Sequence, residues 1–381
     1  MTDRALVVLG ATGSIGRQTI EVAQRHGREI AVIVARRPRP ELVEIVRSFP
    51  TAGVVVTGGS SEEREWFTAE VSNRVQWGTA AMLEAAGRPH SIVVNGLVGS
   101  AGLRPTITAL EAGNRVALAN KESLVAAGAL VMETASRTGA ELIPVDSEHS
   151  ALFQLVAGTQ ESEISSLVLT ASGGPFRGRT SEELTDVTPT EALAHPTWSM
   201  GRRISVDSAT LVNKGLEVIE ANVLFGVGFD RIEVVVHPQS LVHSLVQLSD
   251  GSMIAHVGAT DMRIPIAYAL AYPDRAPSGI PFDLAGVDLQ FEAVDRTTFR
   301  ALDLAYAAGR SGGIAPCIFN AADEIAVQAF LDGRLGFLGI SVLIERTLEA
   351  VTGGPVESVD HVLEVDAEAR SVAASLLPTA C

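Results

Sequence analysis

Two acidic residues, Asp146 and Glu148, stand one residue apart directly after a short apolar run that ends at Val145. In an extended chain such residues share one face, with Cα atoms about 7 Å apart. Like charges beside a core repel each other and resist desolvation, so we expect a group of opposite charge nearby. Hard divalent cations such as Mg²⁺ and Mn²⁺ suit this position, because they prefer oxygen ligands. The alternative is structural: an Asp or Ser here could cap a helix, with Glu148 near its positive end.

A third acid lies further along, in the segment DSATLVNKGLEVIEA that begins at Asp207. If this segment is helical, Asn213 and Glu217 lie one turn apart, and Lys214 and Glu217 form an i, i+3 pair. Ser208 lies near its start, where free N–H groups favour an anion. The segment could bind a phosphate through Ser208, Asn213 and Lys214, while Glu217 completes a three-carboxylate metal site. The alternative is a Lys–Glu pair on a helix surface.

Three further segments place polar side chains where ligands often bind. Lys121 follows the strand-like run RVALAN, and doubly wound sheets bind ligands at the carboxyl ends of strands; an ordinary lysine at a helix start is the alternative. Ser172 precedes two glycines at a strand end, which indicates either an anion site or a simple turn. The loop His195–Gly201, HPTWSMG, combines a histidine with large apolar residues. That combination is typical of a lid that excludes water, or of a loop anchored by a buried Trp198.

A glycine-rich turn lies near the N-terminus. The run VVLGATGSIG places Gly10, Gly13 and Gly16 between a strand and a helix. Glycines there let backbone N–H groups approach a pyrophosphate at the helix N-terminus. The spacing is GxxGxxG rather than GxGxxG, so the strand–helix context carries the prediction of a dinucleotide site. The alternative is that the glycines only allow close packing.

Two arginines, Arg36 and Arg37, follow the second strand-like run. Enzymes that prefer NAD usually place an acidic residue there for the ribose 2′-hydroxyl. Guanidinium groups instead pair with a 2′-phosphate, so the sequence favours NADP. A solvated run of surface charge is the alternative.

The order of the patterns predicts the fold class. Between residues 5 and 145, buried-strand patterns alternate with amphipathic helical ones, which indicates an α/β, Rossmann-like, doubly wound parallel sheet. Mixed strands and helices follow, with a DG turn at Asp250–Gly251, and then a Pro-rich stretch and helical patterns alone. The predicted domains are 1–146 for the cofactor, 147–271 for α+β catalysis with a lid loop at 195–201, a linker at 272–297, and a helical domain at 298–381.

Composition narrows the class of protein. The chain has 381 residues and a formal net charge of −16, which argues against nucleic acid as a partner because phosphate backbones require a basic face. Two distant cysteines, Cys317 and Cys381, give no disulfide framework. No apolar run reaches about 18 residues, and the N-terminus shows no long apolar signal segment. We therefore expect a cytoplasmic protein without membrane contact.

Taken together, the motifs resemble one enzyme family. GATGSIG, LANKESLV, PVDSEHSA, TASGGPF, HPTWSMG, DSATLVNKGLEVIEA, HPQSLVHS and FNAADEIAV occur in this order, and the chain resembles 1-deoxy-D-xylulose 5-phosphate reductoisomerase of the non-mevalonate isoprenoid pathway. The resemblance extends from about residue 5 into the C-terminal helical patterns. PVDSEH together with DSATLVNKGLE is its most specific part.

The resemblance implies a reaction, its cofactors and an assembly. This family isomerises 1-deoxy-D-xylulose 5-phosphate and reduces the aldehyde intermediate with NADPH to 2-C-methyl-D-erythritol 4-phosphate, using Mg²⁺ or Mn²⁺. Its members are homodimers with an NADPH domain, a catalytic domain and a C-terminal helical domain. We expect the same small phosphorylated sugar as substrate and the same homodimer here.

The resemblance also implies site residues. The implied metal ligands are Asp146, Glu148 and Glu217, which are expected to act in catalysis with Lys121. The implied substrate contacts are Lys121, Ser147, Glu148, Ser172, His195, Ser208, Asn213, Lys214 and Glu217. The implied NADPH contacts are Thr12, Gly13, Ser14, Ile15, Asn120, Glu122 and Gly201, to which the arginine run adds Arg36 and Arg37. His149 is left outside the site.

The chain departs from the family pattern at a few positions. ARRP at Ala35–Pro38 stands where AGKN is usual, and Pro38 has no backbone N–H to donate. Val212 and Asp323 stand where Met and Asn are expected, away from the presumed chemistry. Two other functions fit less well. A semialdehyde dehydrogenase needs a nucleophilic cysteine in a catalytic loop, and an NADP-sensing module has no use for three carboxylates.

Overall fold

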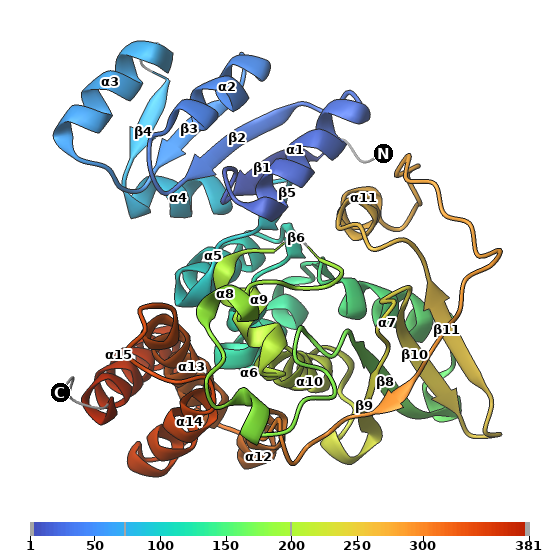
Figure 1. Cartoon of the computed structure of the whole chain (residues 1–381). Helices are drawn as coiled ribbons and strands as arrows, with labels where there is room; N and C mark the ends of the chain where they lie inside the picture. The colour runs from blue at the N-terminus through green and yellow to red at the C-terminus, as the bar shows by residue number, and fades with distance from the viewer. Residues whose placement is uncertain (1–3, 72–73, 199, 378–381) are drawn as a thin grey trace. The chain divides into compact units, whose positions relative to one another are not determined.

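The computed structural model describes residues 4–71, 74–198 and 200–377, and its elements fall into two compact units (Figure 1). The first unit contains Met1–Ser123, Val131–Ser150 and Asp261–Ile280; the second contains Leu124–Leu130, Ala151–Thr260 and Pro281–Cys381. Both are discontinuous in sequence, whereas the domains predicted above are consecutive. The predicted domain boundaries therefore stay a prediction.

A seven-stranded sheet forms the first unit, in the order β4-β3-β2-β1-β5-β6-β7, and all its strands are parallel. Every residue of β5 and β6 is buried, as expected when helices cover both faces of a parallel sheet. The predicted Rossmann-like sheet is confirmed. One strand, β4, escaped prediction because it has three residues and none is buried. The strands are β1 (Ala5–Leu9), β2 (Ile30–Ala35), β3 (Gly53–Val56), β4 (Val75–Trp77), β5 (Ser91–Asn95), β6 (Arg115–Leu118) and β7 (Leu142–Pro144).

Helices connect these strands, and the strand order reverses between β1 and β5, where such sheets bind ligands beyond the carboxyl ends of their strands. The connecting helices are α1 (Ser14–Arg25), α2 (Pro40–Ser48), α3 (Ser61–Val71), α4 (Thr79–Ala86), α5 (Leu103–Glu111) and α6 (Lys121–Thr138), with a 3-10 turn at Gly99–Gly102. Helix α6 is interrupted at Ala127, whose φ of −140° and ψ of 30° are not helical. A helix from far along the chain, α11 (Arg263–Ala271), packs on α1, β6 and β7.

The second unit contains a mixed five-stranded sheet in the order β11-β10-β8-β9-β12. β8 (Ile164–Ala171) pairs parallel with β9 (Ile232–Val236), and the other pairings are antiparallel. The predicted turn at Asp250–Gly251 joins β10 (Val242–Leu248) to β11 (Met253–Val257), with Ser252 N–H donating to Asp250 Oδ1 at 2.9 Å. β12 (Glu292–Ala293) lies inside the stretch predicted as a linker. The predicted α+β architecture is confirmed.

Helices occupy the rest of the second unit. Those before the last region are α7 (Ser147–Ala157), α8 (Pro189–Ala192), α9 (Arg202–Ala209) and α10 (Val212–Phe225), with 3-10 turns at Glu161–Glu163, Glu182–Leu184 and Phe229–Arg231. The C-terminal region is helical as predicted, with α12 (Ala301–Ser311), α13 (Ala315–Leu331), α14 (Gly339–Ala350) and α15 (Val359–Leu376). Helix α13 is largely buried and packs against the other three. No helix in the described ranges has the length and apolar character needed to cross a membrane.

Candidate active site

The acidic turn that follows β7 is held in place by its own hydrogen bonds. Val145 N–H donates to Leu118 O of β6 at 2.8 Å, and α7 begins two residues later. Asp146 Oδ1 accepts the backbone N–H groups of Glu148 and His149 at 3.1 and 3.2 Å. Asp146 therefore caps α7, as the structural alternative predicted. The cap uses only Oδ1, so it does not compete with a role for Oδ2.

The second oxygen of Asp146 accepts a hydrogen bond from Lys121 Nζ at 2.6 Å. Lys121 is the first residue of α6, and its side chain is 10% exposed. His149 Nδ1 lies 2.8 Å from Asp146 Oδ1 and is fully buried. Burial alone would raise the pKa of Asp146, but the Lys121 ammonium and then the His149 hydrogen bond hold it well below its ordinary value. Asp146 is thus a partly buried carboxylate that stays ionised.

His149, which was left outside the predicted site, makes a direct contact with Asp146. A single histidine after two acids has no distinctive spacing. Its contact with Asp146 is an i, i+3 relation, which becomes visible only once α7 is known to begin at Ser147. Ser147 Oγ in turn donates to the Glu148 carboxylate. The polar residues from 146 to 149 therefore lie at one helix N-terminus, where the positive end of the helix dipole favours acidic groups.

On α10, the predicted spacing is confirmed and the predicted surface alternative is wrong. Asn213 Nδ2 donates to Glu217 Oε1 at 2.6 Å, and Lys214 Nζ pairs with Glu217 Oε2. Glu217 is 1% exposed and Lys214 is 3% exposed, so this is a buried ion pair. Charged groups are rarely buried unless they are paired or bind ions. Glu220, one turn further on, is also 1% exposed. Its i, i+3 spacing from Glu217 places both carboxylates on the same buried helix face, which the sequence prediction did not include.

His195 brings two hydroxyl groups together. Its Nε2 lies 2.9 Å from Ser172 Oγ and 3.1 Å from Ser208 Oγ. Its Nδ1 accepts the backbone N–H groups of Thr197 and Trp198 at 3.2 and 2.9 Å. Because Nδ1 is an acceptor and burial lowers the pKa of His195, the neutral ring carries its proton on Nε2. The imidazole N–H and the two hydroxyls form a group of uncharged donors that suits an anion.

The predicted lid loop begins at His195, and a pocket lies close to the same histidine's partner Ser172. The bonds from Thr197 and Trp198 to His195 give the start of the predicted lid loop 195–201 a defined geometry. Ser199 lies outside the described residues. Gly201 is the N-cap residue of α9 and has no side chain to cap it. A pocket of about 410 Å³ lies beside Ser172, and its lining includes Phe176, Arg177, Arg179, Glu191 and Pro196.

The glycine-rich turn is closely packed at two of its three glycines. A Cβ on Gly10 would lie 2.7 Å from Gly96 O, and Gly10 has a φ of +84°. A Cβ on Gly16 would lie 2.2 Å from Gly10 O. Gly13 has one such neighbour, Gly10 O at 3.2 Å, and it is the N-cap residue of α1 without a side-chain cap. Packing explains Gly10 and Gly16, whereas Gly13 leaves backbone N–H groups at an exposed helix N-terminus that suits a phosphate.

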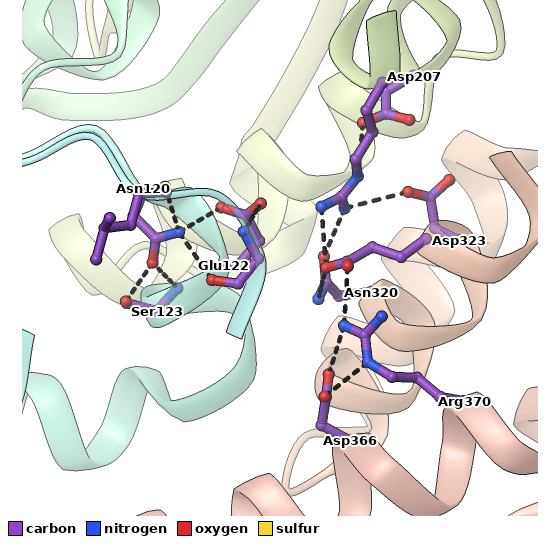
Figure 2. A network of polar contacts seen from close by, with 12 residues as sticks. Asn120, Glu122, Ser123, Asp207, Asn320, Asp323, Asp366 and Arg370 are labelled. Carbon is purple, nitrogen blue, oxygen red and sulfur yellow. Dashed lines mark hydrogen bonds and ion pairs between the residues drawn. The ribbon is translucent and has the colours of Figure 1, made fainter. Parts of the chain in front are cut away.

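The other predicted cofactor residues fall into two groups. Arg36 and Arg37 are exposed directly after β2, next to β1 in the sheet, so the arginines and the glycine-rich turn share one edge. Asn120 and Glu122 are instead engaged within the protein, as Figure 2 shows. Asn120 Nδ2 donates to Leu97 O and Gly99 O at 3.0 Å, and Glu122 accepts from Gly99 N–H at 2.8 Å. These two side chains hold the loop after β5 against the start of α6.

Comparisons with known proteins agree with this architecture along the whole chain. The 1-deoxy-D-xylulose 5-phosphate reductoisomerase family matches residues 6–128, and two C-terminal domains of the same enzyme match residues 142–225 and 257–372. The 1-deoxy-D-xylulose 5-phosphate reductoisomerase of Ralstonia nicotianae is 47% identical over 387 residues, covering 99% of this chain and 98% of that protein. The enzyme of that name from a Geobacillus species is 46% identical and covers 97% and 99%.

Solved structures give the same result. The reductoisomerase from Zymomonas mobilis in complex with NADPH superposes with a TM-score of 0.91 at 39% identity and full coverage of both chains. A DOX-P reductoisomerase in complex with NADPH, fosmidomycin and magnesium gives 0.90 at 37% identity and 98% coverage of each. Fold and site thus define an oxidoreductase built on a dinucleotide-binding sheet. The chain belongs to the 1-deoxy-D-xylulose 5-phosphate reductoisomerase family.

Proposed function

We propose that this protein converts 1-deoxy-D-xylulose 5-phosphate to 2-C-methyl-D-erythritol 4-phosphate, with NADPH as reductant and Mg²⁺ or Mn²⁺ as the metal, in the non-mevalonate route to isoprenoid precursors. The observation that carries the proposal is the acidic group. Among the described residues, Asp146, Glu148 and Glu217 are the one group of side chains that could hold a metal ion together. Three carboxylates and no thiol or imidazole form a donor set that suits a hard divalent cation.

Residues next to the three carboxylates orient them for binding the metal. When bound, the metal supplies Lewis-acid polarisation of the substrate's carbonyl and adjacent hydroxyl. Lys121 orients Asp146 by donating to Oδ2, and Asn213 and Lys214 orient Glu217 in the same way. Hydrogen-bond partners of this kind fix the direction of a ligand carboxylate and so define where the substrate's oxygens must lie. Ser147 lies between the two acids as a further substrate contact.

The substrate's phosphate is assigned to the donors on the second unit. Ser172, Ser208, His195, Asn213 and Lys214 supply hydroxyl, imidazole, amide and ammonium donors. The Ser172 and Ser208 hydroxyls each lie within hydrogen-bond distance of Nε2 of the neutral His195, so the three donors could contact oxygens of one phosphate. The loop 195–201 then excludes water by closing over the substrate.

NADPH is assigned to the first unit. Thr12, Ser14 and Ile15 offer backbone N–H groups to the pyrophosphate at the start of α1. Gly13 contributes by lacking a side chain, since its own N–H donates to Gly10 O at 2.9 Å. Arg36 and Arg37 offer guanidinium groups to the 2′-phosphate. Asn120 and Glu122 shape the loop next to the cofactor through the network of Figure 2. Gly201 belongs to the second unit, and its contact with NADPH stays an expectation from the family resemblance. The reduction itself is the cofactor's chemistry, and the protein supplies orientation.

We further propose a homodimer in the cytoplasm. β11 is an edge strand of the second sheet, and its Met253, Ile254 and Val257 are 53%, 43% and 37% exposed. An exposed apolar edge strand is a surface that another chain can pair with or cover. Four more apolar residues of the same unit are exposed between β11 and the helices, namely Phe282, Leu284, Leu289 and Phe291. The buried free thiol of Cys317 is compatible with a reducing compartment.

A direct assay tests the reaction. Purified protein is mixed with NADPH, Mn²⁺ and 1-deoxy-D-xylulose 5-phosphate, and NADPH is followed at its absorbance band. We expect loss of NADPH that needs the sugar phosphate, stops with EDTA and returns with excess Mn²⁺. NADPH oxidation without the sugar phosphate, or none under any of these conditions, would refute the proposal. A thiol-dependent aldehyde dehydrogenase is disfavoured in advance, because burial raises the pKa of Cys317 to about 12 and keeps the thiol unreactive.

A further inference from the structure

Helix α9 connects the lid loop, which begins with His195, to α10, which carries Asn213 and Lys214. It begins directly after Gly201, the last residue of the lid loop, and it carries Ser208 near its end. It leads through Leu211, in a left-handed conformation with a φ of +62°, into α10 with Asn213, Lys214 and Glu217. Eight residues are too few for a helix to be stable alone in water. The position of α9 must therefore come from its packing and its polar contacts.

Arg203, in the first turn of α9, makes those polar contacts with α13. Its Nη2 donates to Asn320 Oδ1 at 2.9 Å and lies 3.3 Å from Asp323 Oδ2. Its Nη1 lies 2.9 Å from Glu324 Oε1. Within α9, its Nε lies 3.5 Å from Asp207 Oδ2, one turn further on. The guanidinium group of Arg203 thus joins the start of α9 to three polar residues within about one turn of the largely buried helix α13.

The contact continues to the last helix of the chain. Arg370 of α15 pairs with Glu324 Oε2 at 2.9 Å and with Asp366 at 2.7 Å. Figure 2 shows Asp207, Asn320, Asp323, Asp366 and Arg370 along this line. Arg203 and Arg370 therefore share one carboxylate, Glu324, but only Arg203 reaches α9. Arg370 therefore stabilises the C-terminal helices alone, whereas Arg203 also stabilises the position of α9.

We propose that Arg203 is a positioning residue of the reductoisomerase. It touches neither substrate nor cofactor in this assignment. By tying α9 to α13 it fixes Ser208, the His195–Ser208 contact and the C-terminal end of the lid loop in the geometry that receives the substrate's phosphate. The helical C-terminal region thereby sets the affinity of a site to which it contributes no ligand. This inference rests on the proposed function, because it takes Ser208 and His195 as phosphate ligands.

The test compares Arg203→Met with the matched variant Arg370→Met. Both remove a guanidinium from the same network and both keep a long apolar side chain, so we expect similar losses of thermal stability. Arg203→Met should raise KM for 1-deoxy-D-xylulose 5-phosphate by about tenfold or more, because small displacements of a binding group cost affinity steeply. Its KM for NADPH should stay unchanged. Arg370→Met should leave both KM values within about twofold of the wild type.

A second measurement needs no turnover. Inorganic phosphate should raise the melting temperature of the wild type and of Arg370→Met, and should do so much less for Arg203→Met. Arg203→Lys, which keeps the charge but not the fork, should fall between wild type and Arg203→Met in both measurements. Equal KM values and equal phosphate shifts in the Met variants would overturn the inference. A wild type without metal-dependent NADPH oxidation would instead refute the proposed function, whatever the phosphate shifts.

Discussion

Glu217 is the residue on which the proposed chemistry depends most, because it is a buried carboxylate with two donors on its own helix. Glu217→Gln keeps the shape and removes the charge. We expect turnover to fall by about a hundredfold or more, the usual scale for losing a group that stabilises developing charge. Affinity for NADPH, measured by fluorescence titration, should stay nearly intact because the glycine-rich turn is elsewhere. Equal loss of turnover and NADPH affinity would show that Glu217 is structural.

Asp323 makes folding stability depend on pH. Burial raises its pKa to about 6, although Arg203 opposes this and Glu324 adds to it. An unfolded aspartate titrates near 3.9, so between about pH 4 and 6 the folded state binds more protons than the unfolded state. Stability from this group is therefore present at low pH and is lost as pH rises through about 6.

Asp323→Asn removes that titration while keeping an oxygen acceptor for Arg203. At pH 8 the variant should melt a few degrees above the wild type, and at pH 5 the difference should shrink. Melting curves at both pH values decide this. A difference between the two proteins that is the same at pH 5 and pH 8 would contradict the assignment of the raised pKa.

At the residue scale, sequence spacing predicted the contacts of a side chain but not whether that side chain is buried. The i, i+3 and i, i+4 contacts of Glu217 follow from helical geometry and could be read from the sequence. Whether that helix face points to solvent or to the interior depends on elements far along the chain, so the surface alternative stayed open. Arg203 illustrates the same limit. Its partners Asn320 and Glu324 lie more than a hundred positions away, and no local pattern connects them.

At the scale of elements, the first turn shows how a motif combines packing with binding. Gly16→Ala would place a Cβ 2.2 Å from Gly10 O, which the turn cannot accommodate without moving. We expect the affinity for NADPH to fall by about tenfold or more, since the backbone N–H groups at the start of α1 would be displaced. Gly13→Ala, with a contact of 3.2 Å, should cost clearly less. Wild-type NADPH affinity in Gly16→Ala would contradict the assignment of the cofactor to this turn.

Most elements were predictable because their patterns are local. Continuous valine and isoleucine runs predicted β1, β2, β3 and β5, and alternation with amphipathic helices predicted the parallel sheet. The interruption of α6 at Ala127 was not predictable, since the only local mark is Gly128 directly after it, and a single glycine inside a helical pattern is usually tolerated. Nor was the return of α11 to the first unit, which depends on distant contacts. Arg28 donates to Leu270 O at 3.2 Å and Arg115 to Tyr272 O at 2.6 Å.

At the scale of the whole molecule, the proposed homodimer can be tested on β11. Ile254→Lys places a charge on the exposed apolar edge strand, and charges there oppose pairing. We expect the variant to elute as a monomer in size-exclusion chromatography with light scattering. Val342→Lys on α14, where the valine is equally exposed at 43%, is the control and should leave the dimer intact. A wild type that is monomeric at all concentrations would refute the homodimer.

The path of the chain between its two units has a practical consequence for producing parts of this protein. The chain passes from one unit to the other after residues 123, 130, 150, 260 and 280. A gene fragment that stops at residue 150 therefore encodes a cofactor module without α11 and the segment around it. Isolated modules for ligand screening or biosensors should carry residues 261–280 on a short linker. Single cuts would expose the apolar surfaces that this segment covers and would favour insoluble material.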